Sequence, residues 1–110
     1  MTFDALEVAM QMIAAVHPIV AAVQGRDADL ARQIRRAASS VPLNIDEGNR
    51  RKGRDRQHLF RVAAGSACEV RTALRVAAAW QYVEAEEAAT VDALVDRVVA
   101  MLYRLGGGWA

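Results

Sequence analysis

Five basic residues between positions 50 and 56 form the strongest candidate for chemistry in the chain. They are Arg50, Arg51, Lys52, Arg54 and Arg56. Lysine and arginine bind nucleic acids by neutralising phosphates, and side chains on one short loop can reach several phosphates at once. The cluster contains no aromatic residue on which a base could stack, so an ordinary solvated loop is the alternative interpretation.

A second set of polar residues lies on either side of this cluster and completes the candidate site. It comprises Arg35, Arg36, Asn44, Glu47 and Glu69. In one interpretation, Asn44 and Glu47 are recognition groups beside the basic loop. In the other, which we favour, they cap a helix kinked at Pro42 and pair with Arg36, Glu69 or Arg71, because Glu47 has basic neighbours without any ligand.

Residue types that commonly carry out catalysis or bind metals are scattered along the chain. His17 and His58 are far apart, with no carboxylate or cysteine at ligand spacing. The single cysteine, Cys68, excludes an internal disulfide, and we expect it in the core because nothing nearby would activate it as a nucleophile. Phosphate-binding glycine loops and catalytic triads are not recognisable. The sequence therefore predicts no enzyme, no metal and no cofactor.

Apolar periodicity places the candidate residues on helices. The first helix is expected from Phe3 to Val23, and the second follows a cap at Asp27 or Asp29 and ends at Gly48. The third is capped by Asp55 and reaches Gln81, and the fourth runs from Glu86 to Leu105. Short connections make neighbouring helices antiparallel, so the predicted fold class is all-α, an antiparallel up-down-up-down four-helix bundle. Residues 1–105 form its single domain, and residues 106–110 a flexible glycine-rich tail.

The apolar stripes predict which faces are buried. The second helix should bury the residues that recur every three or four positions, namely Leu30, Ile34, Ala37, Val41 and Ile45. The third should bury Leu59, Val62, Ser66, Val70, Leu74 and Ala77. That choice leaves Phe60, Ala64, Ala67 and Arg71 on a second, largely apolar face. The first helix carries almost no charge after Glu7, and these two apolar surpluses together predict self-association.

Folding the second helix back on the third brings two pairs of segments together. Arg35 and Arg36 should lie opposite Cys68 and Glu69, which predicts a partly buried arginine–glutamate bridge. One turn further on, Ser39 and Ser40 should face residues 63–65, whose small side chains allow a close approach of the two helices.

Four motifs in these two helices resemble the signature of a known family. They are Gln33-Ile34-Arg35-Arg36-Ala37-Ala38, Val41-Pro42, Asn44-Ile45-Asp46-Glu47-Gly48 and Gly65-Ser66-Ala67-Cys68-Glu69. Over residues 4–105 the chain resembles the 23S rRNA intervening-sequence proteins, four-helix bundles whose relatives include the accessory variability determinant of diversity-generating retroelements. The resemblance implies a homo-oligomer, with a pentamer favoured, and RNA, DNA, a reverse transcriptase or another protein as partner.

The charge distribution and the apolar runs bound the remaining possibilities. Residues 32–61 carry a net charge of +6, against −3 before them and −2 after them, which indicates an electrostatic partner for the middle of the chain. The longest apolar run, residues 13–23, is too short to span a bilayer, and no signal peptide is recognisable. We therefore expect a cytoplasmic protein without a membrane partner. The predicted function is a nucleic-acid-binding accessory protein, and the alternative is a protein–protein scaffold.

Overall fold

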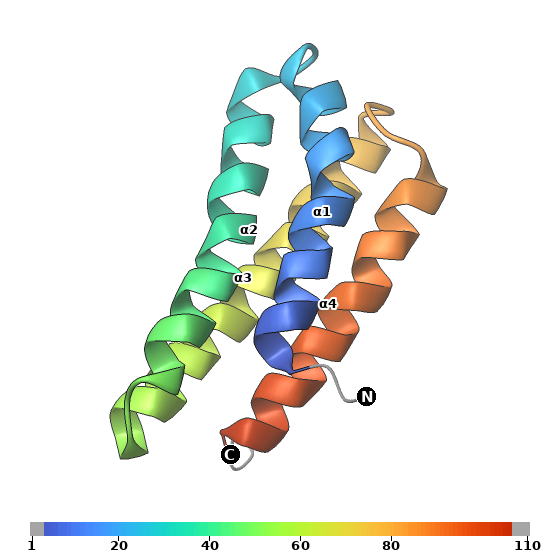
Figure 1. The fold of residues 1–110 in the computed structure, drawn as a ribbon. Coiled ribbons are helices and arrows are strands. Elements are labelled where there is room, and N and C mark those ends of the chain that lie inside the picture. Colours follow the sequence, from blue (N-terminus) through green and yellow to red (C-terminus); the bar gives the residue numbers. More distant parts are fainter. Residues whose placement is uncertain (1–3, 107–110) are drawn as a thin grey trace.

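The structure, a computed structural model, describes residues 4–106, which form four helices around one core (Figure 1). The helices are α1 (Ala5–Gln24), α2 (Ala28–Asn49), α3 (Gly53–Ala79) and α4 (Ala85–Leu105). Consecutive helices run in opposite directions, and contacts join each helix to the next and α4 back to α1. The predicted all-α four-helix bundle is confirmed. The expected first residue of the first helix, Phe3, and all of the predicted tail except Gly106 lie outside the described residues.

Carboxylate side chains begin three of the helices. Asp4 Oδ1 accepts the backbone N–H of Glu7 at 2.8 Å and starts α1. Asp27 Oδ1 accepts the N–H of Leu30 at 3.0 Å, so Asp27 rather than Asp29 is the cap of α2. Glu84 and Glu87 form a reciprocal capping box at the start of α4.

The start of α3 differs from the prediction and shortens the basic loop. The helix begins at Gly53, after Lys52, and no side chain caps it. Asp55 therefore lies in the first turn rather than at the cap, where its charge still favours the positive end of the helix dipole. Gly53 has a φ of +60°, a backbone conformation that glycine adopts without steric cost. As a result Arg54 and Arg56 belong to α3, and only residues 50–52 connect the two helices.

The buried residues of α2 are the predicted ones, whereas the N-terminal half of α3 buries a different face from the predicted one. All five predicted positions of α2 are buried. In α3, Phe60, Ala64 and Ala67 are buried, whereas Val62 is 37% exposed. The second apolar face expected on the third helix is thus part of the core and gives no support to self-association. At the end of α4, Leu105 is exposed.

Gly48 does not end the second helix, contrary to the prediction. It lies inside α2, is buried, and faces the Phe60 ring. A glycine here serves a close approach of two helices, since the side chain opposite it is the largest in the fully buried core.

The first helix is the most apolar element of the bundle. By length and composition α1 could cross a membrane, with a mean hydropathy of 1.7 over its most apolar stretch, of which 39% is buried in the bundle. Core helices of soluble proteins meet the same criterion, so the feature is weak evidence for a membrane. Val8, Met12 and Ile19 of this helix are fully buried and pack against the other helices.

Candidate nucleic-acid interface

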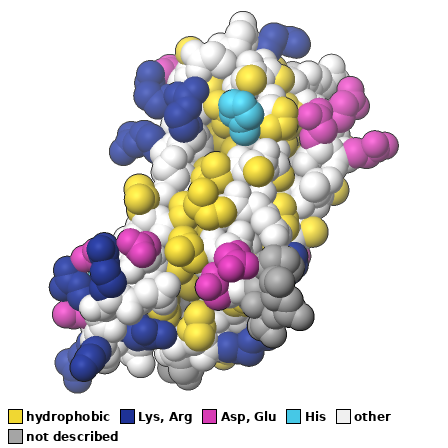
Figure 2. Space-filling view, viewed as in Figure 1, with side chains coloured by type: hydrophobic (Ala, Val, Ile, Leu, Met, Phe, Trp, Pro, Cys, Tyr) yellow, Lys and Arg dark blue, Asp and Glu magenta, His cyan; other side chains and the backbone are white. Residues whose placement is uncertain are grey.

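The basic cluster lies at the end of the bundle where α2 turns into α3. Figure 2 shows Lys and Arg side chains gathered at this end, with acidic side chains between them. Residues 46–56 hold the five predicted basic residues and three acids, Asp46, Glu47 and Asp55. The cluster therefore keeps a net positive charge that is smaller than the count of basic residues suggests.

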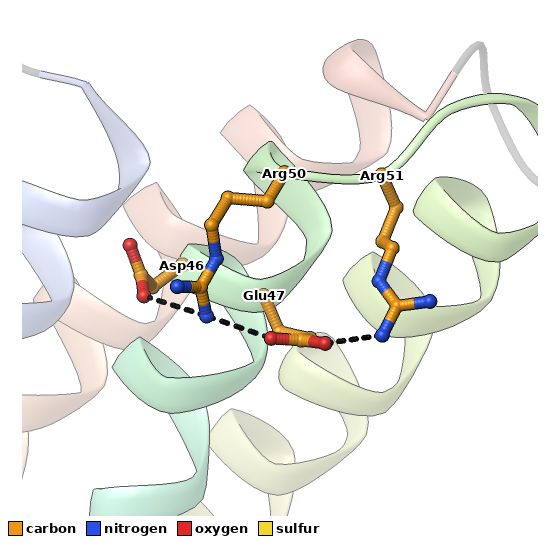
Figure 3. Close-up of polar contacts among 4 residues, drawn as sticks. All are labelled: Asp46, Glu47, Arg50 and Arg51. Atoms are coloured by element: carbon orange, nitrogen blue, oxygen red, sulfur yellow. Dashed lines mark hydrogen bonds and ion pairs between the residues drawn. The ribbon is translucent and has the colours of Figure 1, made fainter.

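Two of the five basic side chains are engaged by carboxylates of the last turns of α2 (Figure 3). Arg50 Nη2 lies 2.7 Å from Glu47 Oε2 and 3.3 Å from Asp46 Oδ2. Arg51 Nη2 lies 2.6 Å from the other oxygen of Glu47. Hydrogen bonds from Arg51 and then Arg50 hold the pKa of the Glu47 carboxyl below its usual value, and the same contact raises the pKa of Arg51. Glu47 thus has structural partners, although they are not the Arg36 or Arg71 that we expected.

The other three members of the cluster have no acidic partner among residues 4–106. Lys52 and Arg54 are exposed, and Arg56 is half-buried because its guanidinium lies over the Phe60 ring, 4.9 Å from the ring centroid. A guanidinium on an aromatic face keeps its N–H donors available at the edge. These three side chains are the ones that the structure leaves ready to contact phosphate.

A chain of hydrogen bonds joins α2 to α3 in the middle of the bundle. Asn44 Nδ2 donates to the backbone oxygen of Ser40 at 2.8 Å and to Ser40 Oγ at 2.9 Å. Ser40 Oγ and Ser66 Oγ lie 2.8 Å apart. The pairing of Ser40 with α3 agrees with the predicted register to within one turn. Asn44 forms these bonds within the turn that contains Pro42, whose backbone nitrogen carries no hydrogen to donate.

The predicted arginine–glutamate bridge is absent from the described residues. Arg36 and Glu69 are both exposed and line the same hollow between α2 and α3, but they are not an ion pair. Arg35 points elsewhere and donates to Gln24 Oε1 at 3.2 Å. The register was nearly right, and the bridge was wrong because both side chains lie on the outer surface, where solvent removes most of the gain from pairing.

The hollow brings together the two halves of the sequence signature. It has a volume of about 280 Å³, and its lining consists of Gln33, Arg36, Ala37, Ser40, Ser66 and Glu69. Sequence reasoning did not assign Gln33 or Ser66 to a site. The signal available for Gln33 was its spacing, since positions 33, 36, 40, 44 and 47 share one face of the helix. Cys68, expected in the core, is exposed beside Glu69.

A separate apolar surface lies between α1 and α2. Figure 2 shows a band of hydrophobic side chains running along this face of the bundle. A hollow of about 470 Å³ on it is lined by Leu6, Met10, Ile13, Ser39, Pro42, Leu43 and Asp46. Met10 is 53% exposed and Leu43 is 69% exposed. We call this surface the α1–α2 face.

Groups of three or more histidine, cysteine or acidic side chains that could hold a metal ion are not found within residues 4–106. His17 and His58 are both exposed and lie on different helices.

Comparison with known proteins identifies the family. The model of the 23S rRNA-intervening sequence proteins matches residues 1–104. The chain belongs to this family. Its fold is also that of a crystallised protein of unknown function from the S23 ribosomal protein family of Bacteroides thetaiotaomicron, with a TM-score of 0.81. That match covers 92% of this chain and 96% of the other at 16% identity, so it establishes the fold alone. No curated protein matches the chain in sequence.

Proposed function

We propose that this member of the family is a nucleic-acid-binding accessory protein that holds RNA or DNA through the α2–α3 loop. The observation that carries the proposal is the set of three cations, Lys52, Arg54 and Arg56, that have no acidic partner among residues 4–106. A cation that is already paired gains less from a phosphate, because it must share its donors. Glu47 and Asp46 reduce the contribution of Arg50 and Arg51 in this way.

The proposed binding is sequence-independent at the loop and involves no catalysis. Contacts between basic side chains and phosphates position a nucleic acid without reading its bases. Counterions released from the phosphates make such binding strongly dependent on salt.

Self-association is part of the proposal, because the net charge of +1 on one chain is small. The α1–α2 face, with Met10 and Leu43 exposed, supports association with further copies. In a closed ring each copy would present its loop at the same rim, and weak contacts would add through effective concentration. Five copies is the number that the family resemblance implies.

A cytoplasmic location completes the proposal. Cys68, the single cysteine of the sequence, is exposed. Free thiols of this kind persist in reducing compartments, where nucleic-acid partners are also found.

The proposal is tested by titrating labelled single- and double-stranded RNA and DNA with the protein at several salt concentrations. The variant Lys52→Gln/Arg54→Gln should weaken binding to all sequences alike and flatten the slope of log K against log salt by about one unit per lost contact. The matched control is Arg75→Gln/Arg97→Gln, which removes the same charge from exposed positions elsewhere on α3 and α4. Absence of wild-type binding at low salt, or equal losses in the two variants, would reject the loop as the site.

A second candidate function is a protein–protein scaffold without nucleic-acid binding. The α1–α2 face favours it, since large exposed apolar patches mark interaction sites. The same titration separates the two functions, because a scaffold would show no salt-dependent binding to any nucleic acid.

A further inference from the structure

The hollow between α2 and α3, which we call the α2–α3 groove, has properties that the loop does not need. Its volume of about 280 Å³ is just below that of drug-sized ligand pockets, which are about 300–1,000 Å³, so it suits one base-sized group rather than a duplex. Its polar side chains come from both helices, with Gln33 and Arg36 on one wall and Glu69 on the other.

The two charges in the groove are opposite and unneutralised. Neither Arg36 nor Glu69 forms an ion pair with any residue in the 4–106 range. A phosphate alone would be repelled by Glu69, and a simple cation would be repelled by Arg36. The groove therefore suits a group that presents hydrogen-bond donors to the carboxylate and acceptors to the guanidinium at the same time.

The floor of the groove has one hydrogen-bond donor to spare. Ser40 Oγ accepts from Asn44, and the contact of Ser40 with Ser66 uses one of the two hydroxyl hydrogens. The remaining hydroxyl hydrogen has no acceptor among the described residues. Both serines line the groove, so a bound group can accept from the free hydroxyl.

We propose that the α2–α3 groove binds a guanine base of single-stranded nucleic acid. Guanine presents its O6 and N7 acceptors next to its N1–H and N2–H donors on one rigid ring. Arg36 donates to O6 and N7, and the Glu69 carboxylate accepts from N1–H and N2–H. Adenine does not fit, because its N1 is a hydrogen-bond acceptor and would face the Glu69 carboxylate, which is an acceptor as well.

The position of the groove relative to the loop fits one strand contacting both. Arg36 and Glu47 lie on the same face of α2, 11 residues apart, which the helical rise converts to about 16 Å, and Glu47 pairs with Arg51 in the loop. A second hollow of about 210 Å³ lies beside the loop and is lined by Glu47, Arg51, Asp55, His58 and Leu59. The inference rests on the proposed function: the loop holds phosphates, and the groove reads one base of the same strand.

The experiment compares oligouridine strands that carry a single guanosine, inosine or adenosine, measured by fluorescence anisotropy. Wild type should bind the guanosine strand about tenfold or more tightly than the adenosine strand, since one bidentate pair discriminates bases to this degree. Inosine lacks the 2-amino group and should fall between them. Glu69→Gln should remove the guanosine preference, and it should change the binding of plain oligouridine no more than the same loss of charge at Glu86 does. Glu86→Gln, an exposed acid on α4, is the matched control and should keep the preference.

These comparisons distinguish an error in the assignment of the groove from an error in the proposed function of the loop. Equal binding of the guanosine and adenosine strands overturns the guanine assignment, whatever the affinity for oligouridine. Absence of oligouridine binding overturns the loop function instead, and guanosine monophosphate then tests the groove by itself through its dependence on Glu69. Binding of a free amino acid that depends on Glu69, without any preference for guanine, would assign the groove to small zwitterions and overturn the inference.

Discussion

The Phe60 ring of α3 lies directly on Gly48 of α2. A Cβ atom added to Gly48 would come within 2.6 Å of Phe60 Cε1 and 2.8 Å of Phe60 Cδ1. The Arg56 guanidinium lies over the same ring. The contact couples the end of α2 to the first turns of α3 and so fixes the loop between them.

Replacement of Gly48 by alanine should destabilise the protein, although alanine favours helices. Overpacking of a core costs about 1–3 kcal/mol, which exceeds the gain of about 1 kcal/mol in helix propensity. Gly65 is the matched control, since an added Cβ there meets nothing within 4 Å. Gly65→Ala should therefore stabilise the chain by about 0.5–1 kcal/mol. Chemical denaturation of the two variants measures both effects, and a stabilised Gly48→Ala variant would contradict the packing described here.

The same contact explains why the sequence predicted α2 better than α3. In α2 one stripe alone is apolar, so the periodicity leaves a single buried face. The first turns of α3 offer two, one with Leu59 and Val62 and another with Phe60 and Ala64. The choice between them is made by the glycine opposite, which gives room for a ring on one side, and a local pattern contains no information about that partner.

Asn44 should contribute more to stability than the charged residues around it. Its amide donates twice to Ser40 within the turn that lacks the Pro42 donor, so Asn44→Ala should cost about 1 kcal/mol in the free energy of unfolding. Glu69→Ala is the comparison, and it should change stability by less than about 0.5 kcal/mol because Glu69 is exposed. Denaturant titration of both variants decides the order. A larger loss of stability in Glu69→Ala than in Asn44→Ala would instead support the partly buried arginine–glutamate bridge that the sequence predicted.

The sequence predicted which residues belong to the candidate site but not which of their side chains form pairs. Spacing places Arg36, Ser40 and Glu47 on one helical face, and folding back about the loop brings Glu69 opposite them. Whether two such side chains pair depends on their depth, which is set by how far each helix is rotated in the bundle. Glu47 pairs with Arg50 and Arg51, which lie three and four residues further along the chain, so this pairing needs no contact with another helix.

Acid should weaken the wild-type protein more than a Glu47→Gln variant. Hydrogen bonds from Arg51 and Arg50 keep the Glu47 pKa below its usual 4.5 in the folded chain. A lowered carboxyl pKa stabilises the fold above the unfolded-state pKa, and this contribution is lost as the pH falls through the lowered folded value. Thermal unfolding at about pH 7 and about pH 3 should thus show a smaller shift for Glu47→Gln than for wild type. High salt should reduce the difference because these pairs are reached by solvent. Equal shifts in the two proteins would mean that the ion pairs add no stability.

Disruption of the α1–α2 face should convert an assembly into single chains. Leu43 is 69% exposed in one chain, so Leu43→Asp should leave the fold intact and charge the centre of the apolar face. Light scattering should give wild type a mass of several times 12.0 kDa, and the variant the mass of one chain. Val76→Asp is the control, since Val76 is also exposed but lies on α3, away from this face. If Val76→Asp dissociates the assembly and Leu43→Asp does not, the interface lies on α3. A wild-type mass of 12.0 kDa at micromolar concentration would contradict self-association. The gain in affinity expected from a ring of loops would then be lost, whereas nucleic-acid binding by a single loop could still be measured.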